Sequence, residues 1–557
     1  MVKLIPTNLT CLAIFATAAA TTPVYDVIVV GSGPGGLVAA EYLSRNSSIS
    51  VLVLEAGVPS LRNTGGSQIP DYIKPEEWTV FDIPGEYTNT AFPHNAKQTR
   101  LRLDWVASPS PLFLGKIVGG SSSLNGMLYF RTSDEYVQET KWPVDARAVT
   151  SNFAEIETMF GSTHIPSPDG HWYLQEAYTI IGNALGANGF REVNINAKCN
   201  NKSKSYGHPP FAIKNGLRDS PAKTFLGAAT KRANFKLLTS ATVSHILQSQ
   251  GVATGVVYTT GTGQSVTVNL SPRGTVVVAA GAVSTPKVLM QSGIGPRDQL
   301  DLLAKNGNFP GVNRDASKWV VNENVGRNMF DTIQKLTTFK HPKMKAFYHD
   351  APPKWALDQY SKVNHTGPWA SPSPILIGYE YIQSNQFQVT GFCHGYEGNA
   401  DPTHLGVQVY LNNPKGRTRC EFRPDGSYHF NLNGGLYSHP DDRSALDTFF
   451  GKLRGYMQGT GSTYVNARGL DGSNHYGGTC VPAIDASDPH RCADGSFKVV
   501  GTSNIFVGDA SLMREGTVNP YGFVMQIGRQ AGGNVQRFLA AKTPRPVHAR
   551  VHPTADE

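Results

Sequence analysis

Residues 24–45 have the sequence VYDVIVVGSGPGGLVAAEYLSR. Val24 to Val30 is short and rich in β-branched residues, as expected of a buried parallel strand. A glycine turn from Gly31 to Gly36 follows, then a helical pattern from Leu37 to Arg45, and a second apolar strand that ends at Glu55. This order of strand, glycine turn, helix, strand and acid predicts a dinucleotide-binding unit.

Each glycine of the turn has a separate physical task. Gly31 permits the tight turn, Gly33 lets a pyrophosphate approach the backbone, and Gly36 lets the helix pack on the strand. Glu55 lies 24 residues after Gly31, where an acidic residue meets a ribose hydroxyl and disfavours the 2′-phosphate of NADP. A glycine-rich turn also arises for steric reasons alone, and these residues do not separate FAD from NAD.

The N-terminus, MVKLIPTNLTCLAIFATAAATTP, predicts a secretory signal peptide over 1–20. Lys3 supplies a positive start, 9–20 is apolar, and three alanines at 18–20 suit cleavage. The alternative is a membrane anchor, but the apolar run is shorter than the roughly 20 residues that span a bilayer. We therefore expect a secreted, extracellular protein with no membrane span.

In a secreted protein, cysteines can form disulfides and Asn-x-Ser/Thr sequences can be glycosylated. Removal of the signal leaves an odd number of cysteines, and their spacing makes Cys480 with Cys492 and Cys393 with Cys420 the candidate disulfides. No set of cysteines and histidines has the spacing of a zinc site, so no metal is expected. Candidate glycosylation sites are Asn46, Asn201, Asn269 and Asn364.

Composition excludes some classes of function. The chain has 557 residues, 40% of them hydrophobic, and a formal net charge of +8. Its basic residues are dispersed rather than gathered in a stripe, which disfavours nucleic acid as a partner. This length predicts two structural domains, or one domain inserted in another.

Four further stretches occur together with the glycine turn. They are LGKIVGGSSSLNGMLYFR (114–131), GAVSTPKVLMQSGIGP (281–296), NVGRNMFD (324–331), and a C-terminal block from Asn474 to Leu539. The set resembles the glucose–methanol–choline family of flavin oxidoreductases over nearly the whole mature chain. Residues 281–295 match the second signature of that family at every constrained position.

Within the family, the closest resemblance is to the flavin domain of cellobiose dehydrogenases. It rests on TGG at 64–66, FDIPG at 81–85, LNGMLYF at 124–130, and the pairing of Asn519-Pro520 with Asn474-His475. Because the nucleotide-binding strand follows the signal directly, we expect a flavin enzyme without the haem domain of those proteins.

The resemblance implies FAD as the cofactor. We expect FAD to be held non-covalently, since no histidine occurs in SSSLN (121–125), near which some relatives attach their flavin. Positions that match the family's cofactor site are Gly120 and Asn125 near the isoalloxazine ring, Val243 near the adenine, and Asp509 and Ala510 beside the ribityl chain and ring.

By the same resemblance, His475 takes the place of the catalytic base. Its pKa near working pH suits it to remove the hydroxyl proton while flavin N5 takes the hydride. The alternative is an ordinary loop histidine. Asn519 matches the second active-site position, where it also meets the flavin. Its amide can bond the substrate oxygen but cannot act as a base, and it is alternatively a helix N-cap.

Aromatic residues near these motifs are candidates for stacking on a substrate. Tyr476 is adjacent to His475, and Tyr129 and Phe130 lie in the 114–131 stretch, while Trp78 is a further candidate. For each, packing in the core is the competing interpretation. Arg514 and Glu515 precede Asn519 and are candidates to face the substrate.

These residues predict an FAD-dependent oxidoreductase that oxidises a hydroxyl of a sugar, an oligosaccharide or another alcohol. The alternative is an aryl or primary alcohol oxidase that produces hydrogen peroxide, and the sequence leaves quinone or oxygen open as the electron acceptor. Some relatives are not redox enzymes and act as hydroxynitrile lyases or cyclases. A non-catalytic FAD-binding protein is disfavoured, because both active-site positions carry capable residues.

The expected fold is α/β, with a Rossmann-like, doubly wound parallel sheet that binds FAD and a second α+β domain built on an antiparallel sheet. We predict the FAD-binding domain from the discontinuous segments 24–150, 212–335 and 470–540. The substrate-binding domain would comprise 151–211 and 336–469, since 408–435 has alternating patterns and turns typical of antiparallel strands. A disordered tail is expected over 541–557.

Overall fold

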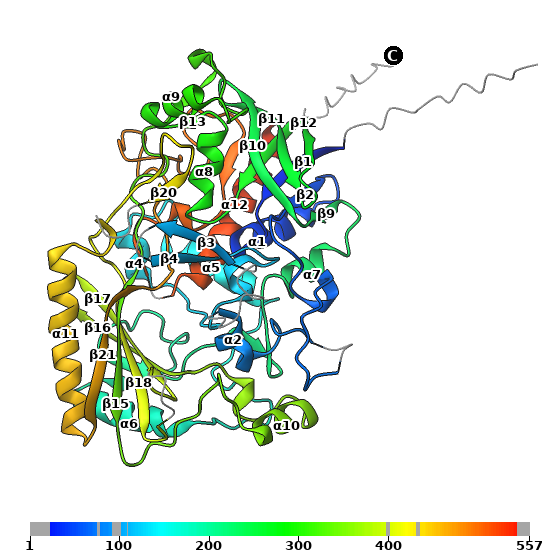
Figure 1. Cartoon of the computed structure of the whole chain (residues 1–557). Coiled ribbons are helices and arrows are strands. Elements are labelled where there is room, and N and C mark those ends of the chain that lie inside the picture. The colour runs from blue at the N-terminus through cyan, green and yellow to red at the C-terminus, as the bar shows by residue number, and fades with distance from the viewer. Residues whose placement is uncertain are drawn as a thin grey trace, which may run out of the picture.

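The computed structural model describes residues 23–74, 78–91, 102–107, 110–396, 401–430, 435–517 and 519–542. Two large sheets lie one above the other, the first in the upper half of Figure 1 and the second in the lower half. The predicted signal peptide falls outside the described residues, as does the predicted tail from 543 on. Residues 541 and 542 are helical, so the tail prediction is wrong at those two positions.

The first sheet has a parallel core. Its strand order is β10 (Ala241–Ser249), β11 (Val252–Thr260), β12 (Ser265–Val278), β1 (Val24–Val30), β2 (Val51–Leu54) and β9 (Phe235–Leu238), with β22 (Ile505–Val507) also paired to β12. Strands β22, β12, β1, β2 and β9 run parallel, whereas β10, β11 and β12 form an antiparallel meander. The strands predicted over 24–30 and 51–54 are confirmed.

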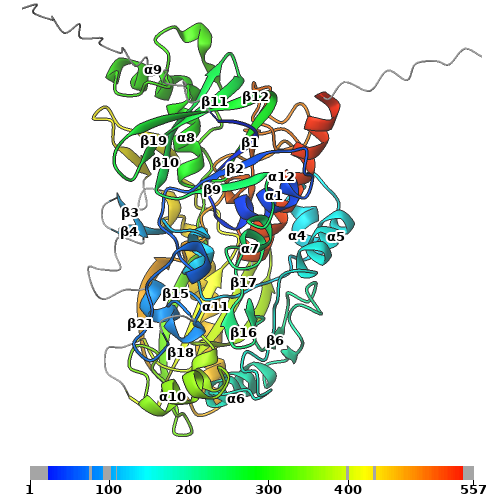
Figure 2. The same ribbon diagram turned by 90° about the vertical axis from the view of Figure 1, so that its right-hand side faces the viewer.

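Both faces of the parallel strands are buried, as their apolar runs predict. Val27 and Val29 point into a core shared with helices α1 (Pro34–Ser44) and α12 (Tyr521–Lys542), whereas Ile28 and Val30 point into the core on the other face. Helix α12 passes close to α1, because a Cβ at Gly528 would lie 2.2 Å from the carbonyl oxygen of Gly35. Figure 2 shows the two helices side by side.

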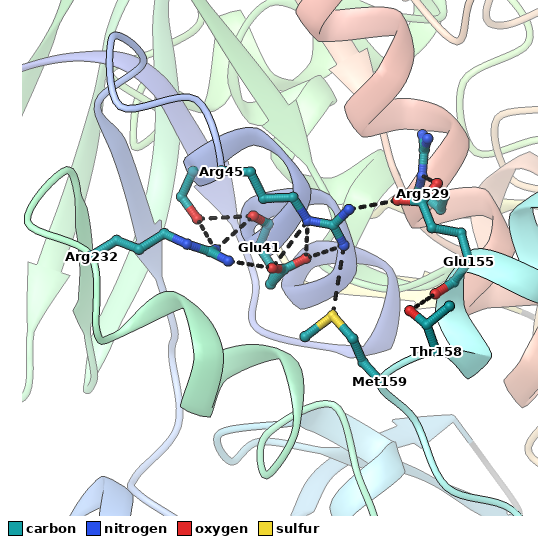
Figure 3. A network of polar contacts seen from close by, with 8 residues as sticks. Glu41, Arg45, Glu155, Thr158, Met159, Arg232 and Arg529 are labelled. Carbon is teal, nitrogen blue, oxygen red and sulfur yellow. Dashed lines mark hydrogen bonds and ion pairs between the residues drawn. The ribbon is translucent and has the colours of Figure 1, made fainter.

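An ionic network fixes the C-terminal end of α1 (Figure 3). The carboxylate of Glu41, only 1% exposed, bonds Arg45 on its own helix and Arg232 beyond α7 (Phe225–Ala229). Arg45 also reaches Glu155 of α5 (Ala146–Glu157), which in turn bonds Arg529 of α12. The network therefore ties α1 to three neighbouring segments.

The second sheet is mostly antiparallel. Its order is β21 (Thr463–Gly472), β15 (Ile333–Lys340), β18 (His404–Leu411), β17 (Asn385–Phe392), β16 (Pro374–Ile382), β6 (Ser205–Gly207) and β5 (Arg191–Glu192). Helices α6 (Gln175–Gly186) and α11 (Pro440–Gly459) cover one face, which we call the outer face. Side chains of Phe387, Val389 and Val409 pack there. Residues that alternate with them point to the opposite, inner face. The combination of a parallel and an antiparallel sheet confirms the predicted fold class.

Smaller elements complete the chain. They are α2 (Tyr87–Ala91), α4 (Asp134–Glu139), α8 (Ser284–Gln291), α9 (Arg297–Asn306), α10 (Lys354–Lys362) and the strand pairs β3 (Arg102–Ala107) with β4 (Ser110–Gly115), β7 (Ile213–Lys214) with β8 (Leu217–Arg218), β13 (Ile294–Gly295) with β14 (Val320–Val321), and β19 (Cys420–Phe422) with β20 (Tyr428–Phe430). Only the start of the 408–435 stretch belongs to the second sheet. The hairpin β19–β20 packs instead against helices α8 and α9, which lie beside the first sheet.

One of the two candidate disulfides is confirmed. Cys480 and Cys492 are bonded, whereas Cys393 and Cys420 are both buried free thiols. The second pairing was wrong because the two side chains lie in different hydrophobic cores. Cys393 packs beneath the outer face of the second sheet, and Cys420 packs in the core below the first sheet. Among the helices of the described ranges, none is long and apolar enough to cross a membrane.

Candidate active site

The glycine-rich turn after β1 leaves its backbone accessible. Gly31 has a φ of +101°, and a Cβ there would lie 2.4 Å from the carbonyl oxygen of Ala279. At Gly36 a Cβ would lie 2.2 Å from the carbonyl oxygen of Gly31, so helix and turn pack closely. At Gly33, by contrast, a Cβ would meet no atom within 4 Å. The open space beside Gly33 lies at the N-terminus of α1, where N–H groups and the helix dipole favour a phosphate.

A second glycine pair lies against this turn. Gly119 donates its N–H to the carbonyl oxygen of Ser32 at 3.1 Å. A Cβ at Gly120 would lie 3.1 Å from the Cα of Gly33. The 114–131 stretch, which the resemblance places near the flavin ring, is therefore adjacent to the predicted pyrophosphate site.

The acid at the end of β2 is buried beside the same turn. One carboxylate oxygen of Glu55 accepts from the backbone N–H and the hydroxyl of Ser32 at 2.9 and 2.6 Å, and the other accepts from the N–H of Gly57 at 2.7 Å. Burial raises the pKa of Glu55. The start of β10 joins here, since Ala241 donates to the backbone oxygen of Glu55, and Val243 follows two residues later, 9% exposed.

Asp509 joins two of the sequence motifs. Its Oδ2 accepts from the hydroxyl of Thr285 at 2.5 Å and from the N–H of Gly281 at 2.8 Å, both in the 281–296 stretch. Its Oδ1 caps the short turn that follows by accepting the N–H of Ser511. Burial raises the pKa of Asp509. Ala510, half-buried, accepts the N–H of Gly478 through its carbonyl, which brings the segment after His475 alongside.

Asn125 is held by a buried arginine. Its side-chain oxygen accepts from Nη1 of Arg218 at 2.9 Å and from the N–H of Met127 at 3.1 Å. Arg218 is 2% exposed, its Nε has no hydrogen-bond partner, and burial lowers its pKa to about 10. A guanidinium therefore stands directly behind the residue that the resemblance places at the flavin ring.

His475 lies on a loop that one carboxylate organises. Asp331 accepts the N–H of His475 at 2.7 Å through Oδ1, and the N–H groups of Ser473 and Asn474 through Oδ2. The hydroxyl of Tyr437 donates to the same Oδ2 at 2.7 Å. The imidazole itself is left uncommitted, because its buried Nδ1 has no hydrogen-bond partner. Burial lowers the pKa of His475 to about 4, so the ring is neutral at neutral pH and can accept a proton.

Asn519 is oriented by the second sheet. Its Oδ1 accepts from Nε2 of Gln388 at 2.9 Å. Gln388 on β17 lies directly opposite Tyr410 on β18, and the ring of Tyr410 stacks on that of His475 at 6.4 Å with 13° between the planes. Two neighbouring residues of the inner face thus contact the two residues predicted to form the active site. Because α12 begins at Tyr521, Asn519 lies one residue before the N-cap position of that helix.

The inner face around this pair is rich in amide and hydroxyl groups. Gln388 also donates to the hydroxyl of Thr390 at 3.1 Å, while its own Oε1 is buried without a partner. On the next strands Gln408 donates to Gln334. These four side chains carry hydrogen-bonding groups and no formal charge, and Gln388, Thr390 and Gln408 are buried on the inner face.

Comparison with known proteins agrees with this geometry. A family model described as GMC oxidoreductase matches residues 25–334. The chain belongs to this family. Oxygen-dependent choline dehydrogenase of Vibrio vulnificus is 29% identical over 449 residues, which cover 71% of this chain and 70% of the relative.

Solved structures share the fold of this GMC oxidoreductase. A formate oxidase variant of Aspergillus oryzae superposes with a TM-score of 0.72 at 17% identity, covering 93% of this chain and 99% of the other. A fungal aryl-alcohol oxidase superposes with a TM-score of 0.68 at 17% identity, covering 92% and 99%. FAD is the cofactor typical of the family. The open backbone at Gly33, the buried acid Glu55 and the uncommitted Nδ1 of His475 fit such a group.

Three predicted substrate contacts of the GMC oxidoreductase are buried in its core. Tyr129 is inaccessible, packs on Phe160 with ring centroids 5.1 Å apart, and bonds Glu157. Phe130 is 1% exposed and meets Tyr379 edge-on. Tyr476 is 5% exposed and donates its hydroxyl to Asn474. The structure thus supports the packing interpretation, because adjacency to a motif in sequence does not direct a side chain towards the ligand.

The weaker substrate candidates also have structural partners. Arg514 forms an ion pair with Asp488 at 2.9 Å and bonds the carbonyl of Pro482. The ring of Trp78 meets His365 edge-on and lies 4.9 Å below the ammonium of Lys223. Glu515 accepts the hydroxyl of Tyr136 through its backbone oxygen, and burial raises its side-chain pKa.

Four residues at the site were not assigned a role from the sequence. Asp331 ends the NVGRNMFD motif, whose only sequence signal is its resemblance to the family. Gln388 and Tyr410 lie in alternating strands, and that alternation is a signal that they share a face. Arg218 has no pattern that distinguishes it from an exposed arginine, since its burial arises from tertiary packing.

Proposed function

We propose that this GMC oxidoreductase binds FAD non-covalently and oxidises a hydroxyl of a sugar or oligosaccharide, with His475 as the base. One observation carries the proposal. Tyr410 and Gln388, directly opposite each other on the inner face, contact His475 and Asn519 respectively. A hydroxyl placed between His475 and Asn519 would meet a proton acceptor and an amide at the same time.

His475 has the state that a base requires. Its imidazole is neutral, Nδ1 has no competing donor, and its backbone is held by Asp331. It accepts the hydroxyl proton as the C–H bond breaks. FAD, when bound, supplies the acceptor for the hydride. Because the loop is anchored, the imidazole is held near its reactive position, and less conformational entropy is lost when it reacts.

Asn519 completes the oxygen site. Since its Oδ1 accepts from Gln388, its Nδ2 is the group that turns towards the substrate. A donor at that position binds the substrate oxygen and holds the hydroxyl towards His475. Asn519 has no basic nitrogen, so proton removal falls to His475 alone.

The residues that would hold FAD come from all the family motifs. Gly31, Gly33 and Gly36 would hold the pyrophosphate, Glu55 would bind the ribose, and Val243 would adjoin the adenine. Gly120, Asn125, Asp509, Ala510 and Asn519 would contact the ribityl chain and the ring. The absence of histidine in residues 121–125, near which some relatives attach their flavin, supports the proposal of non-covalent binding.

Polar side chains of the inner face support the proposed substrate class. Gln388, Gln408, Gln334 and Thr390 present amides and a hydroxyl on one face, and such groups bond the several hydroxyls of a sugar. The resemblance to cellobiose dehydrogenases supports the same class.

Secretion is proposed from residues 1–20, and the Cys480–Cys492 bond is in keeping with an oxidising compartment. A quinone or oxygen would serve as the electron acceptor.

A second candidate is an oxidase of aryl or primary alcohols that produces hydrogen peroxide. Aromatic rings on the inner face favour it, since Tyr410 stacks on His475 and Phe392 lies 5.3 Å from Tyr396. The fold shared with a fungal aryl-alcohol oxidase is compatible with it. An aromatic substrate would use these rings in place of the amides.

Anaerobic absorbance at the flavin maximum tests both candidates. Purified holoenzyme is mixed in turn with cellobiose, glucose, an aryl alcohol and choline. Bleaching by the sugars supports the proposal, and subsequent addition of oxygen or a quinone identifies the acceptor. Bleaching by the aryl alcohol alone selects the second candidate. A flavin that stays oxidised with all of them overturns both and directs attention to lyase or cyclase chemistry.

A further inference from the structure

A surface pocket lies on the opposite side of the second sheet from His475 and Asn519. It has a volume of about 620 Å³ and is lined by the turn before α6, the exposed side of that helix, and residues that follow β15 and α11. Trp172, Glu176, Asn183 and Lys343 are among its lining residues. Because α6 covers the outer face, this pocket is separate from the candidate active site.

Trp172 supplies the pocket with a rigid aromatic surface. The indole is 45% exposed, yet its ring stacks on that of His208 at 4.5 Å with 11° between the planes. His208 in turn stacks on Tyr178 at 3.7 Å. The indole N–H donates to the carbonyl oxygen of His164 at 2.9 Å. An exposed tryptophan held on one face and one edge loses little conformational entropy when a ligand covers it.

The turn that carries Trp172 is strained in a way that points to function. Leu174, which also lines the pocket, has a φ of +60°, a left-handed conformation that is uncommon for a side chain of this size. Gln175 then begins α6, and its side chain bonds the imidazole of His208 at 2.8 Å. Burial lowers the pKa of His208 to about 4, so the stack is uncharged at neutral pH.

Polar groups surround the indole and remain available. Among the described residues, the side chains of Glu176, Asn183 and Lys343 make no hydrogen bond or ion pair. One acid and one base leave these three groups with no net charge, which disfavours a nucleic acid or a highly charged peptide. They supply donors and acceptors for a neutral ligand rich in hydroxyl groups.

We propose that this pocket binds a pyranose unit of an oligosaccharide or polysaccharide. The C–H groups on one side of a pyranose ring carry partial positive charge and pack on the negative face of an indole. The hydroxyls at its rim reach Glu176, Asn183 and Lys343. Since the pocket lies open at the surface, a polysaccharide chain can extend beyond it. The site anchors the enzyme on a carbohydrate and does not depend on which alcohol is oxidised.

Native affinity electrophoresis of the holoenzyme tests the proposal without any turnover. Gels contain hydroxyethyl cellulose, xylan or galactomannan, and dissociation constants come from retardation against polysaccharide concentration. The variant is Trp172→Ala. The matched control is Trp355→Ala, because Trp355 on α10 is 57% exposed and lies outside the pocket.

At least one polysaccharide is expected to retard the wild type and the Trp355→Ala variant equally. Trp172→Ala should raise the dissociation constant at least tenfold. Asn183→Ala, which keeps the indole, should weaken binding about threefold or more. Flavin reduction by a small substrate should be unchanged in all variants. Equal retardation of Trp172→Ala and wild type, or no retardation of the wild type by any of the three polysaccharides, would overturn the proposal.

Discussion

The carboxylate of Asp331 fixes the backbone of His475, because its Oδ1 accepts the N–H of His475 at 2.7 Å. Its other oxygen accepts from two preceding N–H groups and from the hydroxyl of Tyr437. Asp331 lies two residues before β15 of the second sheet. A single buried side chain therefore positions the proposed base relative to the second sheet.

Replacing Asp331 by Asn should slow flavin reduction without loss of FAD. Asparagine presents an amide NH₂ where one carboxylate oxygen now accepts N–H groups, so the loop must shift. Displacement of a catalytic group by about 1 Å costs up to about 100-fold in rate, and a lost buried hydrogen bond costs about 1–3 kcal/mol of stability. Stopped-flow absorbance and urea unfolding measure the two effects.

The control for this variant is Tyr437→Phe. It removes one of the four bonds to Asp331 and leaves the three backbone bonds, so reduction should slow by less than threefold. A normal reduction rate in Asp331→Asn would show that the carboxylate does not position the base.

Replacing His475 by Ala should reduce the rate of flavin reduction by about two to four orders of magnitude, the usual contribution of a general base. The flavin spectrum should persist, since the cofactor contacts come from other motifs. His171→Ala is the matched control, because its imidazole is exposed beside Asp169. Comparable rates in the two variants would remove His475 from the mechanism.

The rate of flavin reduction should stay high in acid. His475 has a pKa lowered by burial to about 4, so the neutral base persists as the pH falls from 6.5 to about 4 and is lost below it. The native state binds this proton less tightly than the unfolded chain does. His475 therefore lowers the free energy of unfolding as the pH falls through the same window. Burial raises the pKa of Asp331, which bonds the N–H of His475, to about 7. Reduction rates from pH 3.5 to 8 in the wild type and in Asp331→Asn separate the two groups, and an acidic limb near 6.5 in both proteins would contradict the prediction for His475.

Replacing Gln388 by Leu should impair substrate oxidation through Asn519. Without the donor from Nε2, the amide of Asn519 can rotate and present its oxygen to the substrate oxygen. We expect kcat/KM to fall about tenfold, the value of a hydrogen bond of about 1.4 kcal/mol. Thr390→Val is the control, since it removes the other acceptor of Gln388 and leaves Asn519 bonded. If both variants lowered kcat/KM equally, Gln388 would support the structure of the second sheet and would not orient the amide of Asn519.

Replacing Glu41 by Ala should destabilise the FAD-binding unit. It removes a buried carboxylate from Arg45 and Arg232, so that Arg232 loses its carboxylate partner while Arg45 keeps its ion pair with Glu155. Breaking a buried pair costs about 3–5 kcal/mol. We expect about 3 kcal/mol, because the arginine side chains are 36% and 28% exposed. Urea unfolding measures the loss, and Glu323→Ala, at an exposed pair with Arg327, should change stability by less than about 1 kcal/mol.

Local patterns predicted the nucleotide-binding unit because its physics is local. The strand, the turn at Gly31 to Gly36, the helix and the acid Glu55 follow one another within 32 residues. A side chain at Gly36 would clash with Gly31, five residues earlier. A side chain at Gly31 would clash with Ala279, which directly follows the adjacent strand β12. The same holds for Cys480 and Cys492, which are separated by 12 residues.

Residues contributed by distant segments were not predictable in this way. Gln388 bonds Asn519 across 131 residues, and Asp331 bonds His475 across 144. The aromatic candidates Tyr129 and Tyr476 illustrate the opposite error. Each is next to a motif in sequence, but successive side chains point in different directions, so one neighbour faces the site and the next packs in the core.

Residue types and their short spacing were enough to predict the family, the parallel strands of the first sheet, the glycine turn, and His475 and Asn519 as candidate active-site residues. The folded chain was needed to show which face of the second sheet these two residues contact, which carboxylate holds the loop of His475, and which cysteines stay apart. Chain proximity sets local conformation, whereas burial, hydrogen-bond partners and pKa values are set by whichever distant segments the fold packs together.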